Sequence, residues 1–126
     1  MTILSFRAAG SISAGDVIYL AGGLAQKGIG TALDQASVVG VAIDAGQVGD
    51  LVRVNSDSVY TSSLSFTPGE FQYLSVATSG AIVNYPAWQA EFNSLPVSGV
   101  YLTKVGRAVT SSNLEVEIQK PVYIIK

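Results

Sequence analysis

The sequence predicts an all-β protein, a small antiparallel β-barrel or β-sandwich of two pseudo-symmetric halves with at most one short helix. Three observations support this prediction. Short apolar segments are separated by glycine-containing turns at intervals of roughly 8–12 residues, the spacing typical of sandwiches and barrels. Several short phrases occur twice in the chain and in the same order. A single segment has the apolar spacing of a helix.

The predicted strands alternate apolar and polar residues, or they are rich in β-branched and aromatic residues. Near the C-terminus, for example, Leu114, Val116 and Ile118 would face the core, while the side chains between them would face solvent. The first segment is expected to be an edge strand or an arm. The expected strands are residues 3–8, 16–20, 39–43, 51–54, 59–61, 71–78, 81–83, 102–110, 114–119 and 122–125.

The helical pattern lies in PAWQAEFNS, residues 86–94. Pro86 suits a first helical position, and Trp88 and Phe92 are four residues apart, on one face of a helix. Together with Tyr85 they form an aromatic group that has two interpretations. It could be the anchor of a protein contact, which we favour, or it could plug one end of a barrel.

An internal duplication is predicted from two matches. SAGDVIYL at residues 13–20 corresponds to TPGEFQYL at residues 67–74, with glycine, an acidic residue and Tyr-Leu in the same places. VGVA at residues 39–42 corresponds to VGRA at residues 105–108. A single match of this kind arises by chance, but two in the same order indicate duplicated halves within one domain of residues 1–126.

The spacing of the matches places an insertion in the second half. Gly15 and Gly69 are 54 residues apart, whereas Gly40 and Gly106 are 66 residues apart. The difference fits best at residues 84–98, which contain the helical segment. The halves are then about 12–65 and 66–120, and LVRV at residues 51–54 loosely matches LEVE at residues 114–117.

Composition excludes several kinds of chemistry. The chain has no cysteine and no histidine, so disulfides, thiolate metal sites and a Ser-His-Asp triad are unavailable. The acidic pairs Asp44 with Asp50 and Glu115 with Glu117 lie at a turn and on a solvated strand face, which is unlike a glycosidase pair. No loop has the ligand spacing of a calcium site. We therefore expect no catalytic residue, no metal site, no cofactor and no enzyme activity.

Charge and hydropathy limit the kinds of partner that the chain is expected to bind. Charged residues make up 13% of the chain and the net charge is −2, so no basic face is expected for nucleic acid. No apolar run approaches the roughly 18 residues of a membrane-spanning helix, and the first residues do not resemble a signal peptide. Such a low charge suggests surface hidden in an assembly, although a β-rich protein with a Ser/Thr surface is the alternative.

Three phrases carry a resemblance to a known family: ISAGDVIYL at residues 12–20, VVGVA at 38–42 and GDLVRV at 49–54. With them the chain resembles the capsid decoration, or cement, proteins of tailed bacteriophages, whose sequences pass through a Gly-Asp turn, Val-Gly-Val-Ala, and a second Gly-Asp before a strand. The resemblance covers most of the first half and returns weakly at residues 105–108.

The resemblance implies a β-barrel or β-sandwich domain on the outside of a capsid. It implies that the chain is made in the host cytoplasm, often forms a homotrimer, and bridges subunits of the major capsid protein against internal DNA pressure. Neither nucleic acid nor membrane would be a partner. The alternative function is a tail-fibre or spike module that binds a host receptor or glycan, for which Tyr85, Trp88 and Glu91 are the candidate residues.

The apolar terminal segments, residues 2–6 and 122–125, are expected to pair with neighbouring chains, because unpaired apolar strand edges otherwise lead to aggregation. Together with the aromatic group, these segments supply the predicted protein-interface residues. They are Leu4, Phe6, Tyr85, Trp88, Phe92, Tyr123 and Ile125.

Overall fold

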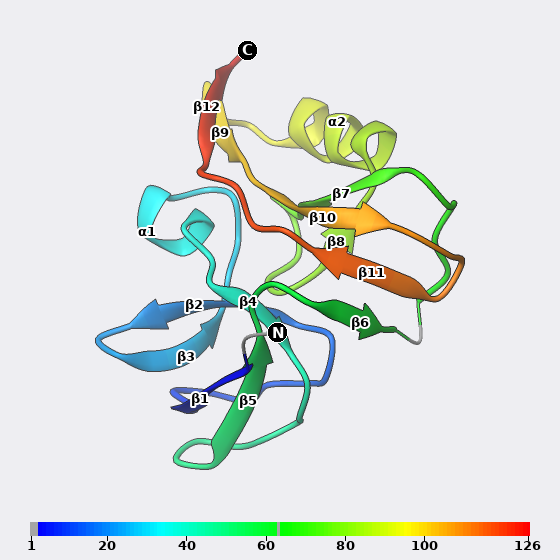
Figure 1. The fold of residues 1–126 in the computed structure, drawn as a ribbon. Coiled ribbons are helices and arrows are strands. Elements are labelled where there is room, and N and C mark those ends of the chain that lie inside the picture. The colour runs from blue at the N-terminus through cyan, green and yellow to red at the C-terminus, as the bar shows by residue number, and fades with distance from the viewer. Residues whose placement is uncertain (1–2, 63) are drawn as a thin grey trace.

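The computed structural model describes residues 3–62 and 64–126 (Figure 1). The protein is mainly β, as predicted, with three antiparallel sheets, two of them five-stranded. No closed barrel is present in the described part of the chain. The first sheet contains β1 (Ile3–Arg7), β2 (Val17–Ala21), β3 (Leu24–Lys27), β4 (Gly40–Ala42) and β5 (Leu51–Asn55). The second contains β6 (Val59–Thr61), β7 (Phe71–Leu74), β8 (Ile82–Val83), β10 (Lys104–Ala108) and β11 (Asn113–Val116), and the third pairs β9 (Gly99–Leu102) with β12 (Val122–Ile125).

The described residues include two short helices, so the prediction of at most one helix is wrong. The predicted helix is α2 (Tyr85–Ser94), which begins as expected with Pro86 at its start and with Asn84 as its N-cap. The additional helix is α1 (Leu33–Ala36), a single turn. Four residues are too few to show a helical apolar period, and α1 is held in place because Ala36 is buried in the core.

The two five-stranded sheets have the same topology. Their strand orders are β1-β5-β4-β2-β3 and β6-β11-β10-β7-β8, which are identical when the strands of each sheet are numbered along the chain. Each sheet also has a turn glycine at positive φ, Gly15 at 94° and Gly69 at 89°. The amides of these glycines donate to the carbonyl oxygens of Ala42 at 2.8 Å and Ala108 at 2.7 Å.

The strand register corrects the third sequence match. Val54 lies opposite Ala42 in the first sheet, and Leu114 lies opposite Ala108 in the second, so Leu114 corresponds to Val54 and not to Leu51. The predicted alignment was shifted by three residues, and an odd shift exchanges the two faces of a strand. Leu51 is exposed, whereas Val54 and Leu114 are both buried.

Other strand boundaries also differ from the prediction. Strand β3 was not predicted; it forms a hairpin with β2 through Gly22 and Gly23, both at positive φ. The segment 102–110, predicted as one strand, is divided at the buried Thr103 between β9 and β10, which belong to different sheets. The hydroxyl of Thr103 donates to the carbonyl of Ala36 at 3.0 Å and so ties this division point to α1.

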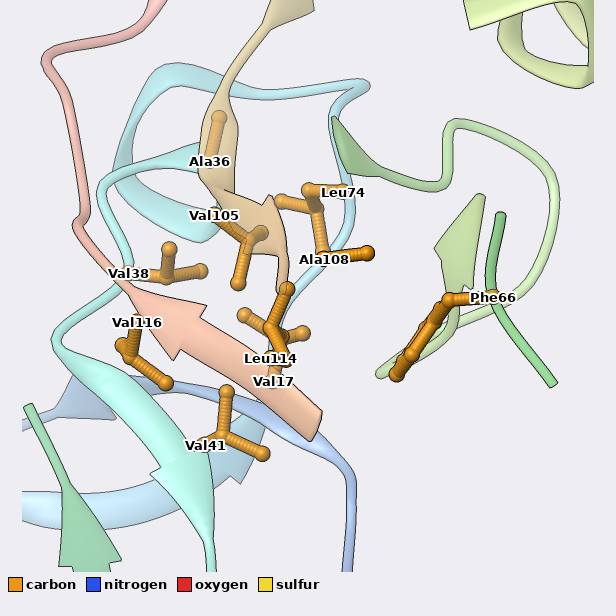
Figure 2. Close-up of a cluster of buried hydrophobic side chains, with 10 residues drawn as sticks. All are labelled: Val17, Ala36, Val38, Val41, Phe66, Leu74, Val105, Ala108, Leu114 and Val116. Atoms are coloured by element: carbon orange, nitrogen blue, oxygen red, sulfur yellow. The ribbon is translucent and has the colours of Figure 1, made fainter. Parts of the chain in front are cut away.

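The core consists of three apolar clusters. One is formed mainly by residues of the first sheet, and another lies beneath α2. The third, which we call the shared cluster, joins the two sheets, because it takes Val17 and Val41 from the first and Leu74 and Leu114 from the second (Figure 2). The shared cluster comprises Val17, Ala36, Val38, Val41, Phe66, Leu74, Val105, Ala108, Leu114 and Val116.

Candidate interaction edges and a candidate pocket

The C-terminal strand β12 has an open edge. Lys126 donates its amide to the carbonyl of Ser98 at 2.9 Å, and Ile124 lies opposite Val100. Because hydrogen-bonded pairs alternate along an antiparallel ladder, the backbone groups of Tyr123 and Ile125 point away from β9. No described residue pairs with these outward groups.

The side chains of this strand are equally accessible. Tyr123 is 50% exposed and Ile125 is 71% exposed. The Tyr123 ring packs on Tyr101 across the ladder, with centroids 5.0 Å apart, and lies over Gly99, where a side chain would clash with it. These contacts fix the ribbon of β9 and β12 in its conformation and leave the β12 edge free for a further strand.

The N-terminal strand β1 has a second open edge at its first residues, before the chain reaches the bridge between Ala8 and Ala25 of β3. The amide of Ala8 donates to Asp50 at 2.8 Å, so by the same alternation Leu4 and Phe6 bond to β5 while Ile3 and Ser5 face outward. Leu4 is exposed, and Phe6 is half-buried against the first-sheet cluster. Residue 2 of the predicted segment 2–6 lies outside the described residues. Figure 1 shows β1 and β12 at opposite ends of the molecule.

The aromatic group of α2 is divided between core and surface. Trp88 is 2% exposed and Phe92 is also buried, with their rings 5.3 Å apart, whereas Tyr85 is exposed. The structure thus gives Trp88 and Phe92 the core position of the second interpretation, because they face Val76 and Val100. Among the predicted interface residues, these two side chains are not accessible to a partner.

The group proposed for a receptor or glycan does not form a groove. The Tyr85 ring stacks on Trp88 at 6.0 Å, so its inner face is covered. The carboxylate of Glu91 accepts hydrogen bonds from the hydroxyl of Ser75 at 2.9 Å and from the amide of Val76 at 3.0 Å. These bonds attach α2 to the loop after β7, which is a structural role. Trp88 Nε1 has no hydrogen-bond acceptor among the described residues.

Two of the acidic residues singled out in the sequence, Asp44 and Asp50, have structural partners. Asp44 binds the guanidinium of Arg53 through both carboxylate oxygens, at 2.8 and 2.9 Å, and these hydrogen bonds lower the pKa of Asp44 below its ordinary value. Asp50 accepts from the amide of Gln47 at 2.9 Å and closes its turn. No group of three metal-binding side chains occurs among residues 3–62 and 64–126. The helices described are all too short or too polar to cross a membrane.

A pocket of about 310 Å³ lies in the second half, between the turn that precedes β7, strands β7 and β8, and the start of α2. Its walls include Phe66, Ile82 and the polar side chains of Glu70, Gln72 and Asn84. Sequence reasoning did not find this site, since its residues come from four separate segments. No family model matches the sequence, and no curated protein matches it.

Proposed function

We propose that this chain is a structural protein of a phage virion, a capsid decoration protein that binds the outer capsid surface and bridges subunits of the major capsid protein. Three phrases of the first half, at residues 12–20, 38–42 and 49–54, support this proposal through their resemblance to cement proteins. The observation that carries it is the presence of two open, apolar strand edges, on β1 and β12. Such edges bind neighbouring chains by strand addition.

The positions of the edges favour a ring of identical copies. The two edges differ in sequence and lie at opposite ends of the molecule (Figure 1). Pairing between β12 of one copy and β1 of the next would therefore be head-to-tail, and head-to-tail contacts close into rings when the rotation between copies permits. A homotrimer is the ring that the resemblance implies.

We further propose that the two five-stranded sheets arose by duplication, as the sequence matches suggest. Their common strand order and the equivalent hydrogen bonds from Gly15 and Gly69 support this origin. The segment inserted in the second half, residues 84–98, then contains the whole of α2 and leads into β9, and β9 provides the ribbon on which β12 lies. The duplicated scaffold would hold the two open edges apart at a fixed distance.

The test uses Ile125, whose amide faces the open edge. Ile125→Pro removes that outward donor and breaks no internal ladder bond, so the melting temperature should change little. Ile125→Ala is the matched control, since it shortens the side chain and keeps the amide. We expect wild-type protein and the alanine variant to form trimers by light scattering and to co-sediment with empty capsids of the phage that encodes the chain. The proline variant should do neither; a wild-type monomer that ignores capsids would refute the proposal.

A further inference from the structure

The pocket of the second half is lined by Gln72, whose residue as a whole is 3% exposed. Among the described residues, Trp88 Nε1 is the one fully enclosed side-chain polar atom without a hydrogen bond, so the amide of Gln72 is not cut off from the surface. An amide on a pocket wall can donate hydrogen bonds to a molecule in the pocket and accept them from it.

In the first half, the position equivalent to Gln72 is occupied by an apolar core residue. Ile18 lies opposite Gly40 in the first sheet, and Gln72 lies opposite Gly106 in the second, so the two residues are equivalent. Ile18 is completely buried in the apolar cluster of its sheet. The same scaffold thus accepts isoleucine, and the amide in the second half is not required for the strand to form.

The surroundings of Ile18 and Gln72 also differ, because the space beside Ile18 is covered and the space beside Gln72 is not. In the first half, Ala8 forms a bridge to Ala25 on β3 and helps to cover the cluster around Ile18. In the second half, no bridge joins the described residues after β6 to β8. The register also places exposed Ser112 where the first half has the buried Val52. Space that is filled in one half is open in the other.

The walls of the pocket define the chemistry of a ligand. Among the described residues of the lining, Glu70 is the only charged one and none is basic, which disfavours phosphates and other anions. Asn84 uses its Oδ1 to accept from the amide of Ala87 at 3.1 Å, so its NH₂ group remains available as a donor. Phe66 and Ile82 add an apolar wall, and Phe66 stands apart from the other side chains of the shared cluster in Figure 2.

We propose that this pocket binds one neutral sugar unit of a glycan. A sugar hydroxyl both donates and accepts, which matches the amide of Gln72, the carboxylate of Glu70 and the amide of Asn84. The apolar wall suits the carbon face of the ring. The volume of about 310 Å³ is at the small end of ligand sites and accommodates one unit instead of a longer chain. This inference does not depend on the capsid proposal.

The test is an NMR titration of the isolated, ¹⁵N-labelled chain with the methyl glycosides of glucose, galactose and N-acetylglucosamine. We expect at least one glycoside to bind with a millimolar dissociation constant and to shift the side-chain amide signals of Gln72 and Asn84. Gln72→Ile, which copies the first half, should weaken binding at least about tenfold, the effect of losing about 1.4 kcal/mol. Gln89→Ile, on the exposed side of α2, is the matched control and should bind normally.

A second variant separates folding from recognition. Asn84→Asp keeps an oxygen to cap α2 but removes the NH₂ donor, so it should remain folded and bind the glycoside more weakly. The proposal is overturned if no glycoside shifts the pocket signals, or if Gln72→Ile binds as well as wild type. It is also overturned if methylguanidinium binds there and the sugars do not, since the site would then be a cation site at Glu70. None of these results depends on capsid binding.

Discussion

Replacing Trp88 with alanine tests whether the aromatic group of α2 belongs to the core. The indole is 2% exposed, stacks on Tyr85 at 6.0 Å and meets Phe92 at 5.3 Å. It fills the centre of the cluster beneath α2, opposite Val76 and Val100. Truncation would leave a cavity that the surrounding strands and helix cannot collapse into without losing their own contacts.

The expected loss is large for a protein of this length. Truncating a buried tryptophan costs about 3–5 kcal/mol of unfolding free energy. At about 4 °C per kcal/mol, the melting temperature should fall by roughly 12–20 °C. Trp88→Phe should cost much less, about 1 kcal/mol, because the smaller ring also removes the unpaired Nε1 donor, whose burial is unfavourable.

Calorimetry and denaturant unfolding monitored by circular dichroism measure these differences. Tyr85→Ala is the matched control, because Tyr85 lies on the same helix but is exposed, and it should shift the melting temperature by only a few degrees. The reasoning is refuted if Trp88→Ala melts like wild type while its binding to capsids or to other copies is lost. That result would mean that the indole leaves the core to contact a partner.

Three further predictions concern structural contacts. Asp44→Asn should reduce the loss of stability in acid, because the hydrogen bonds from Arg53 hold the pKa of Asp44 below its ordinary value. This contribution is fully present well above the pKa of an aspartate in the unfolded chain and is lost as the pH falls through the lowered pKa of the folded state; unfolding free energies at neutral and acid pH measure it. Alanine at either Gly40 or Gly106 should destabilise the fold by about 1–3 kcal/mol, since the new methyl group would meet the backbone of the neighbouring strand; equal melting of either variant and wild type would contradict the close approach. Thr103→Val should cost about 1–3 kcal/mol in urea unfolding, because it leaves a buried carbonyl of α1 without its donor.

Local signals in the sequence were sufficient for the fold class and for the turns. The Gly-acid turn before each Tyr-Leu strand was predicted from Gly15 and Gly69, and both glycines have the positive φ that no other residue adopts easily. Strand boundaries were predicted wrongly where contacts with residues distant in the sequence determine them. Thr103 continues the β-favouring pattern of residues 102–110, yet the chain changes sheets there, at the point where its hydroxyl donates to the carbonyl of Ala36 in α1.

The candidate sites were predicted less completely than the fold. The open edges of β1 and β12 follow from the apolar residues of terminal segments, and the sequence located both. It favoured a protein contact for Trp88, whereas the structure buries this residue, because an aromatic residue on a helix suits a core and an interface equally well. It missed the pocket, because Gln72 reads as an ordinary strand residue until the register places it opposite Gly106, where the other half has Ile18.

The comparison between the halves indicates where function is to be sought. Both sheets have the same strand order, so any feature confined to one half is not a requirement of that order. The second half alone has the ten-residue helix α2, the ribbon of β9 and β12, and the pocket around Gln72. In the first half the corresponding interior is closed and apolar, which is the arrangement that folding by itself favours. A glutamine amide adds less to a core than the isoleucine of the first half, so its place on the pocket wall in the second half alone supports the proposed binding there.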